Sequence, residues 1–223
     1  MVPRRARVQT RLERWAKNGA MLLIGTGLVR LLALVAPALA MAAAAGLASE
    51  LGWGLFNLIR LPVWLEIALA IIVLDFAIWF QHLMSHKVPL LWRIHRVHHA
   101  DSDMDASTAL RFHPIEIAIS AVYKLGAVFL LGPAVLAAIS FEVILNASAI
   151  FNHSNLRLPK WADQALRLVL VTPDMHRVHH SIHRDEHDQN YGFCLSIWDR
   201  LFKTYTAAPR GGHEGMIVGL RSN

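Results

Sequence analysis

The chain has 223 residues, 55% of them hydrophobic, and a formal net charge of +6 at pH 7. Its mean hydropathy of +0.38 exceeds that of most soluble domains of this length and indicates a membrane protein. Cys194 is the single cysteine, which excludes a disulfide framework, a four-cysteine zinc site and a cysteine-ligated iron–sulfur cluster. The basic residues gather at the N-terminus and around histidine-rich segments, so we expect no nucleic-acid partner.

The first expected element is a membrane helix preceded by basic sequence. Residues 1–17 carry six Lys and Arg side chains against one acid, and an apolar stretch follows from Met21 to Leu47. This pattern predicts a basic cytoplasmic segment over residues 1–20 and a first spanning helix. A cleaved signal peptide is the alternative, because Ala38-Leu39-Ala40 resembles a processing site, but the apolar stretch continues well past it.

Two further apolar regions complete the predicted membrane part. A short polar, glycine-containing turn precedes the run from Leu61 to Phe80, which is long enough to span a membrane. The region from Ile117 to Asn152 is divided at Gly132-Pro133 and predicts a hairpin of two tilted helices. The sequence therefore predicts four spans.

With four spans, every histidine lies on the same side of the membrane. The excess of Lys and Arg on that side marks it as cytoplasmic, in a bacterial inner membrane or in the endoplasmic reticulum. No linker-like composition divides the chain. We therefore expect one membrane-embedded domain over residues 21–206 and a C-terminal tail over 207–223.

The histidines carry the strongest functional signal. The pentapeptide HRVHH occurs twice, and each copy places three imidazoles at i, i+3 and i+4 on one helical face. An i, i+4 pair of histidines follows the second apolar run. Neutral imidazole binds iron, zinc, copper or nickel, and eight clustered histidines suffice for two ions. The predicted ligands are His82, His86, His95, His98, His99, His176, His179 and His180.

The last apolar segment adds a ninth candidate. Glu142, Asn146, Ala149 and His153 share one helical face that ends at the cytoplasmic boundary, and polar groups in membrane helices point inward. We predict His153 as a ligand, with a structural hydrogen bond as the alternative. Glu142 is expected to pair with Lys124 across the hairpin rather than to act as a catalytic acid.

Other residues are candidates to orient the ligands through hydrogen bonds. Asp75 lies seven residues before His82 on the same helical face, although a simple inward hydrogen bond explains it equally well. The complete set of such candidates is Asp75, Asn146, His183 and His187.

Two other function classes stay open on the residues alone. A non-oxidative membrane metal-binding protein is one, and a zinc-dependent membrane hydrolase is the other. The HExxH and G-x-S-x-G motifs are both missing from the sequence, which counts against a hydrolase. A metal buffer would use a low-complexity tract, whereas these triplets lie far apart.

In order and spacing, the HxxxH motif at 82–86 and the HxxHH motifs at 95–99 and 176–180 resemble the fatty acid hydroxylase and sterol desaturase superfamily. RFHPIE at 111–116, FNHSN at 151–155 and NYGFCLSIWDRLFKTY at 190–205 support the resemblance, which covers roughly residues 70–206. It implies an all-α integral membrane enzyme with a cytoplasmic helical cap that carries a histidine-rich dimetal site. It also implies two iron ions that activate O2 and oxidise a lipid C–H bond to an alcohol or an alkene.

The resemblance carries expectations about partners as well. The chain has no haem-binding region, so electrons would come from a separate cytochrome b5-like protein or a ferredoxin with its reductase. Some relatives have a further polar residue or histidine four positions before His153, where this chain has Ala149, so the second iron is expected to have fewer ligands. A fatty acyl, sterol-like or other isoprenoid lipid could each be the substrate.

Overall fold

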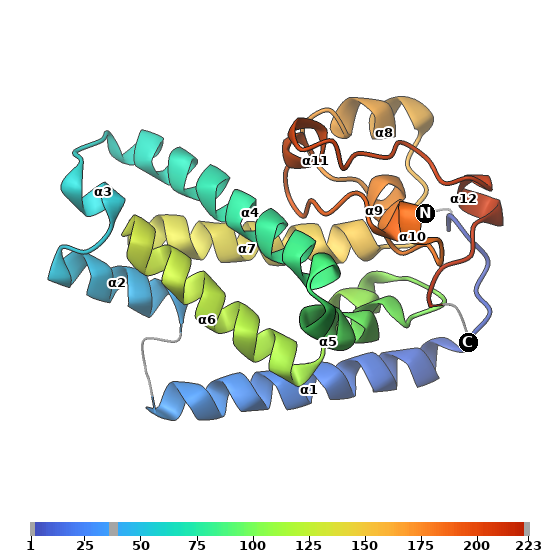
Figure 1. Ribbon diagram of the computed structural model, residues 1–223, viewed down its shortest axis with the longest axis horizontal. Coiled ribbons are helices and arrows are strands. Elements are labelled where there is room, and N and C mark those ends of the chain that lie inside the picture. Colours follow the sequence, from blue (N-terminus) through green and yellow to red (C-terminus); the bar gives the residue numbers. More distant parts are fainter. Residues whose placement is uncertain (1–2, 36–39, 221–223) are drawn as a thin grey trace.

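The computed structural model describes residues 3–35 and 40–220, and these are helical apart from isolated β-bridges and loops. Long helices lie side by side, most of the short helices gather at one end of them, and the short helices of residues 41–58 lie at the other end (Figure 1). The long helices are α1 (Arg11–Val35), α4 (Val63–Lys87), α6 (Pro114–Leu131) and α7 (Val135–His153). The shorter ones are α2 (Met41–Leu51), α3 (Leu55–Leu58), α5 (Pro89–His99), η2 (Ala106–Leu110), α8 (Lys160–Leu166), α9 (Pro173–His179), α10 (Arg184–His187), α11 (Ile197–Leu201) and α12 (Gly212–Gly215).

Three described helices, α4, α6 and α7, are long and apolar enough to cross a membrane, with mean hydropathies of 2.2, 1.7 and 1.7. The predicted hairpin is present, because α6 ends at Leu131 and α7 begins at Val135. Large apolar side chains of this hairpin are solvent-exposed in the isolated chain, including Leu130 at 77% and Val143 at 65%. Such a surface is suited to lipid contact.

The prediction of one continuous helix from Met21 to Leu47 is wrong. Helix α1 begins earlier and ends at Val35, and α2 starts separately at Met41. The interval 36–39, which includes most of the Ala38–Ala40 processing-site alternative, lies outside the described residues. Within the described ranges, three helices rather than four therefore qualify as spans.

The early start of α1 has a polar cause. The guanidinium of Arg14 donates to both carboxylate oxygens of Asp101, at 3.0 and 2.8 Å, and at 2.8 Å to Asp105. Arg14 is only 2% exposed, and Asn18 one turn later is fully buried. Charge-assisted contacts of this kind are strong in a buried setting, so they fix the first turns of α1 against the polar end of the molecule.

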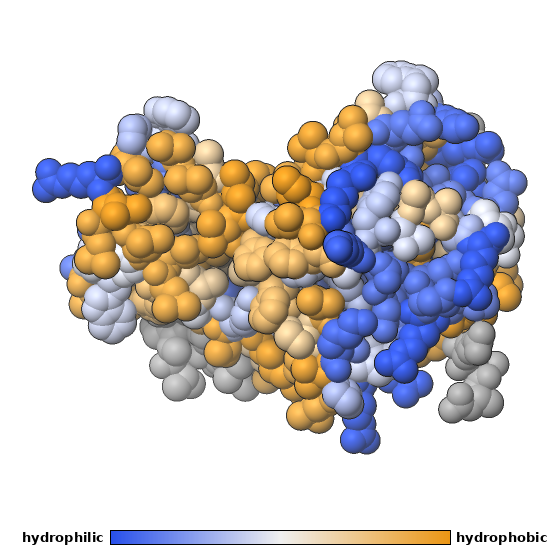
Figure 2. Space-filling model, turned by 45° about the horizontal axis from the view of Figure 1, so that its top comes forward, coloured by the Kyte–Doolittle hydropathy of each residue, from blue (hydrophilic) through white to orange (hydrophobic). Residues whose placement is uncertain are grey.

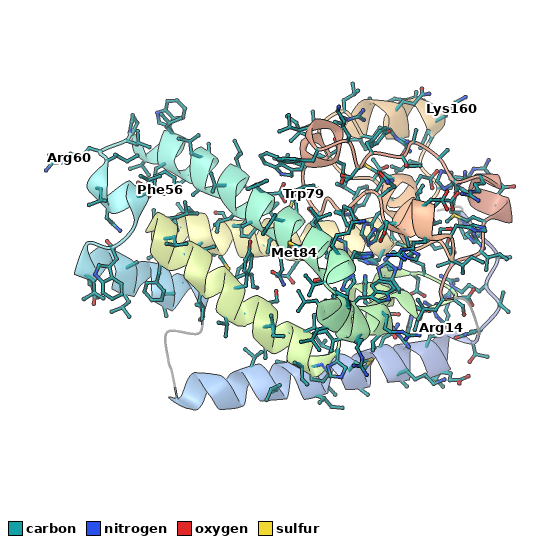
Figure 3. The ribbon with its side chains drawn as sticks, in the orientation of Figure 1. Arg14, Phe56, Arg60, Trp79, Met84 and Lys160 are labelled. Carbon is teal, nitrogen blue, oxygen red and sulfur yellow. The ribbon has the colours of Figure 1, made fainter. Side chains whose placement is uncertain are left out.

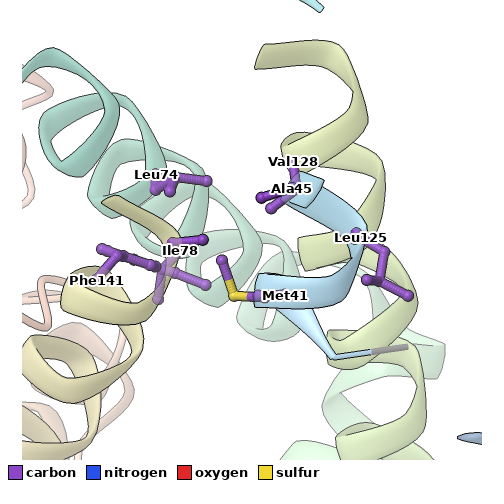
Figure 4. Packing of buried hydrophobic residues seen from close by; sticks show 9 residues of the cluster. Met41, Ala45, Leu74, Ile78, Leu125, Val128 and Phe141 are labelled. Atoms are coloured by element: carbon purple, nitrogen blue, oxygen red, sulfur yellow. The ribbon is translucent and has the colours of Figure 1, made fainter. Parts of the chain in front are cut away.

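The helices meet in a core built around α2. Met41 and Ala45 of α2 pack with Leu74 and Ile78 of α4, with Leu125 and Val128 of α6, and with Phe141 of α7 (Figure 4). The alanines of α2 that face this core are fully buried. Small side chains let helix backbones approach closely, which is how helices associate in lipid.

Two glycines allow the far end of the bundle to close. Gly132 caps α6 in the left-handed conformation, with φ of 58°, and a Cβ there would lie 2.2 Å from the carbonyl oxygen of Trp53. A Cβ on Gly54 would meet the backbone nitrogen of Gly132 at the same distance. Any side chain at either position would therefore push these backbones apart.

The polar residues collect at the opposite end. Figure 2 shows a hydrophobic surface over the helical bundle and a hydrophilic surface over the region of the short helices, here called the cap, residues 88–113 and 154–220. Helices α4 and α7 end at the cap and α6 starts from it, so all three bring their cap-side ends together. The tail contributes to the cap, since Val218 pairs with Ser181 and the amide of Gly219 donates to the carbonyl of His180.

Candidate metal centre

Turns at the cap bring the histidine segments together. Pro89 occupies the first turn of α5, where a missing amide costs nothing, and it follows the last residues of α4 directly. Helix α9 starts at Pro173, and the side chain of Thr172 caps it by accepting a hydrogen bond from the amide of Met175. Nitrogen atoms concentrate beside the end of α4 that carries Met84 (Figure 3).

All nine predicted ligands lie in this region, and all are buried, with none more than 6% exposed. Their ring nitrogens form two sets, and within each set one nitrogen from every residue lies within 4.8 Å of the others. The first set contains His82, His86, His95, His99 and His179, and the second contains His98, His153, His176 and His180. The geometry is that of two adjacent metal sites.

Each HRVHH copy contributes to both sets, but in opposite ways. In the first copy the i, i+4 pair His95 and His99 joins the first set, and the intervening His98 joins the second. In the second copy His179 joins the first set while its two companions join the second. The rings of His99 and His180 stack across the boundary, with centroids 4.5 Å apart. The two sets of histidines are therefore in direct contact.

Distances between ring nitrogens fit metal ligation. Nε2 of His82 lies 3.2 Å from Nε2 of His95, and Nε2 of His153 lies 3.0 Å from that of His98 and 3.2 Å from that of His176. Each of these pairs falls within one set. Two neighbouring ligands about 2.1 Å from one ion, at a right angle, would be about 3.0 Å apart.

Hydrogen bonds to Nδ1 select the tautomer that ligation needs. His82 donates from Nδ1 to the carbonyl oxygen of Tyr191 at 2.7 Å, and His179 donates to that of Gln189 at 2.8 Å. Because a carbonyl oxygen can only accept, Nδ1 carries the proton and the lone pair stays on Nε2. His98 and His153 make the same kind of bond, to the carbonyls of Arg111 and Ala149.

The remaining nitrogens supply the test of whether a metal fits. His86, His99 and His180 have both ring nitrogens buried without a hydrogen-bond partner among the described residues. Nε2 of His179 and Nδ1 of His176 are in the same condition. Unsatisfied buried polar atoms cost roughly 1–3 kcal/mol each, and ions bound at these nitrogens would remove that cost. The residues fit a two-metal centre.

Electrostatics keep these imidazoles neutral. Burial, and then the neighbouring rings, hold the pKa of five of these histidines well below its ordinary value; the five are His98, His99, His176, His179 and His180. A neutral imidazole is the form that binds a metal. The donor set is thus ready for ions at neutral pH.

Glu116 is a functional residue that the sequence reasoning missed. Its Oε1 lies 2.6 Å from Nδ1 of His95, and its side chain is buried in the first turn of α6. A carboxylate on the far nitrogen of a ligand fixes the ring and raises its basicity. The sequence signal was its place at the end of RFHPIE, a motif that was noted only for its resemblance.

The predicted orienting residues lie in different surroundings. Asp75 accepts hydrogen bonds from the amides of Cys194 and Leu195 and from Nε1 of Trp198, so its described bonds hold the C-terminal motif rather than a histidine ring. Asn146 donates to the backbone oxygen of Glu142 at 2.7 Å.

The two outer histidines lie at the edge of the centre. His187 stacks on Trp92, with centroids 5.3 Å apart, and forms a smaller potential metal group with His86 and Asp188. The amide of His183 donates to the hydroxyl of Ser181. His187 thus lies next to His86 of the first set, with ring centroids 6.0 Å apart.

The C-terminal motif, residues 190–205, supports the position of His82 in the first set. Asp199 is fully buried and accepts hydrogen bonds from Nε1 of Trp79 at 3.0 Å and from the amides of Tyr191 and Gly192. Burial raises the pKa of Asp199, although these hydrogen bonds favour its charged form. The carbonyl of Tyr191 is thereby held where His82 donates to it.

An apolar cavity reaches the centre from the bundle. It has a volume of about 330 Å³ and extends from His82, His95 and Glu116 to side chains at the middle of α6 and α7. Leu22 and Val29 of α1 and Phe112 line its apolar wall. A cavity of this kind, open to metal ligands at one end, can hold an apolar molecule beside them.

Comparison with known proteins agrees with this geometry. The sequence profile described as fatty acid hydroxylase matches residues 67–204, more than half of the chain. The chain belongs to the fatty acid hydroxylase family. The matched region contains all nine histidines of the two sets, and the resemblance drawn from the histidine motifs is confirmed. No solved structure matches the chain.

The names of several curated relatives of this chain describe enzymes that act on lipids. An alkylglycerol monooxygenase of Xenopus tropicalis is 33% identical over 92% of this chain and 45% of its own length. An ornithine lipid hydroxylase of Rhizobium tropici is 28% identical over 67% of this chain and 44% of its own. A human cholesterol 25-hydroxylase is 29% identical over 60% and 48%. The chain thus spans less than half the length of these relatives.

Proposed function

We propose that this protein is an oxygen-dependent di-iron membrane oxidoreductase that hydroxylates a C–H bond of a lipid. The single observation that carries the proposal is the separation of nine buried histidines into sets of five and four beside an apolar cavity. The relatives are named as hydroxylases and monooxygenases, which favours hydroxylation over desaturation.

Two iron ions held by the two sets would supply the activation of O2. The balance is one lipid C–H bond, O2, two electrons and two protons converted to a C–OH bond and water. The electrons are proposed to come from a separate donor, cytochrome b5-like or a ferredoxin with its reductase, at the cytoplasmic side. The smaller second set, which has Ala149 instead of a further donor one turn before His153, agrees with fewer ligands on the second iron.

The chain's own residues position and shield the reaction. The carbonyl and carboxylate acceptors on Nδ1 hold the rings, and Glu116 orients His95 at the cavity wall. The apolar lining keeps water from the reacting carbon, which limits side reactions. The metal ligands His82 and His95 face the same cavity, so a bound lipid lies next to them.

Metal content and isotope transfer test this proposal. Protein made without an affinity histidine tag should hold two irons per chain by elemental mass spectrometry. With a reductase system and ¹⁸O₂, the product alcohol should contain one ¹⁸O atom. His98→Ala and His179→Ala should each lower the metal content and abolish oxidation.

Two alternatives predict other results. One tightly bound zinc that iron reconstitution does not replace, with lipid hydrolysis in the absence of O2, would support a zinc hydrolase. Variable metal content without any reductant-dependent consumption of O2 would support a metal-binding protein without oxidative chemistry. Either result would refute the di-iron proposal.

A further inference from the structure

Charged and polar side chains line the middle of this mainly apolar cavity. Lys124 of α6 and Glu142 of α7 face each other there, with Nζ and Oε1 3.8 Å apart, and Asn146 lies one turn beyond Glu142. The expected pairing across the hairpin is thus present. All three side chains line the cavity that also reaches His82 and His95.

The depth of this pair makes it costly. Eight positions separate Glu116 from Lys124 on α6, which corresponds to about 12 Å along the helix axis. Both helices are long and apolar enough to span a membrane, and in such a spanning hairpin the pair would lie within the hydrocarbon region. Ionisable groups at that depth are expensive and are retained mainly where they bind or transport something.

The pair also has unused hydrogen-bonding capacity. Among the described residues, neither the Lys124 ammonium nor the Glu142 carboxylate makes a side-chain hydrogen bond, and their 3.8 Å contact is long for a closed ion pair. An ammonium offers three donors and a carboxylate about four acceptor positions. The pair is partly exposed, with exposed side-chain fractions of 23% for Lys124 and 40% for Glu142, and both side chains line the cavity, so these free positions are open toward it.

We propose that Lys124 and Glu142 bind a hydroxyl group of the lipid substrate, with the apolar remainder of the molecule extending about 12 Å toward His82 and His95. A hydroxyl is donor and acceptor at once, so it can donate to the carboxylate and accept from the ammonium. A carboxylate ligand would be repelled by Glu142, and an amine by Lys124. The site therefore selects an uncharged alcohol lipid; this inference rests on the proposed function, which makes the bound lipid the substrate.

Binding without turnover tests the assignment. The probes are hexadecan-1-ol, hexadecane and hexadecanoate, and their retention by the detergent-purified full chain is measured by native mass spectrometry without reductant. The alcohol should bind about ten- to a hundredfold more tightly than the alkane, as expected for hydrogen bonds to charged groups. In the double variant Lys124→Met/Glu142→Leu, which keeps volume and removes both charges, that ratio should fall toward one.

A single charge change gives an independent reading. Glu142→Gln removes the repulsion of an anion and leaves Lys124 without its partner, so the preference should switch from the alcohol to hexadecanoate. Val143→Leu, on the neighbouring lipid-exposed position, is the matched control and should retain the natural preference. Unchanged alcohol selectivity in the folded double variant, or no gain of hexadecanoate binding by Glu142→Gln, would overturn the inference.

The two proposals fail in distinguishable ways. If the protein does not oxidise lipids, the alcohol preference and its loss in the variants would still be seen, since they need no reaction. If the hydroxyl site is wrong, oxidation and iron content would persist while the variants leave selectivity unchanged. Iron content measured on each variant separates loss of selectivity from loss of fold.

Discussion

Replacing Glu116 with glutamine changes one carboxylate oxygen to an amide and tests the architecture of the first metal set. The 2.6 Å contact of Oε1 with Nδ1 of His95 is the single described hydrogen bond between a carboxylate and a ring of the centre. Loss of such a partner typically lowers metal affinity about 10- to 100-fold, which is about 1.4–2.7 kcal/mol. The amide oxygen can still accept a hydrogen bond from Nδ1 of His95, so the fold should persist, but the negative charge that raises the basicity of the ring is lost.

The expected effect is confined to one ion. His95 belongs to the set of five, and the other set has no bond to Glu116 among the described residues. Glu116→Gln should therefore lose one iron of two at a chelator concentration that removes neither from the natural protein. The assay is iron per chain after dialysis against graded chelator. The surface variant Glu13→Gln is the matched control, since Glu13 pairs only with Lys17 on an exposed face.

Two results would refute this reasoning. If Glu116→Gln holds both irons as tightly as the natural chain, the carboxylate does not support the ligand. If both irons leave together at the same chelator concentration, the two sets do not bind independently. Loss of one ion alone would support the division of the histidines into five and four.

Further predictions concern stability. Gly132→Ala should lower the unfolding free energy by about 1–3 kcal/mol in detergent, because φ is 58° and a Cβ would strike a carbonyl oxygen; Gly126→Ala, which meets nothing, should be neutral or stabilising. Arg14→Ala removes the guanidinium that pairs with buried Asp101 and that is the nearer of two partners of Asp105, the other being Arg7, and should cost about 3–5 kcal/mol in denaturant unfolding. Burial opposes ionisation of Asp101, but hydrogen bonds from Arg14 and Thr108 outweigh it and lower the pKa of Asp101. This stabilisation is present above the unfolded pKa, near 3.9, and is lost as the pH falls through the lower folded value. Lowering the pH from 6 to 3 should therefore reduce the free energy of unfolding more in the natural chain than in Arg14→Ala. Removal of the metals should lower stability by about 4 kcal/mol relative to protein with free metal at a thousandfold excess over Kd, and an unchanged melting temperature would contradict metal binding to the folded chain.

Local sequence patterns were enough to identify the histidines that the structure brings together. The i, i+3, i+4 spacing places three imidazoles on one face wherever the segment is helical, and both copies are at the ends of helices, α5 and α9. A polar residue in an otherwise apolar helix was enough to single out His153 and to predict the pairing of Lys124 with Glu142. The hairpin followed from Gly132-Pro133, because the two residues end one helix and precede the next.

The predicted bounds of the first helix were wrong because hydropathy alone cannot detect polar tertiary contacts. The run from Met21 to Leu47 reads as one helix, but α1 starts early, where Arg14 meets Asp101 and Asp105 across a long separation in sequence. The second half of the run forms α2, whose alanines pack in the core. Asp75 is a similar case, since its three donors come from the C-terminal motif.

The sequence by itself determined that this is a helical membrane protein with a nine-histidine site, since hydropathy and ligand spacing are local properties of the chain. Only the tertiary structure decided which histidine belongs to which of the two sets. That division depends on the positions of α4, α5, α7 and α9 relative to one another, so identical HRVHH copies make opposite contributions. The role of Glu116 beside His95, and the meeting of Lys124 with Glu142 inside the cavity, follow from the same packing.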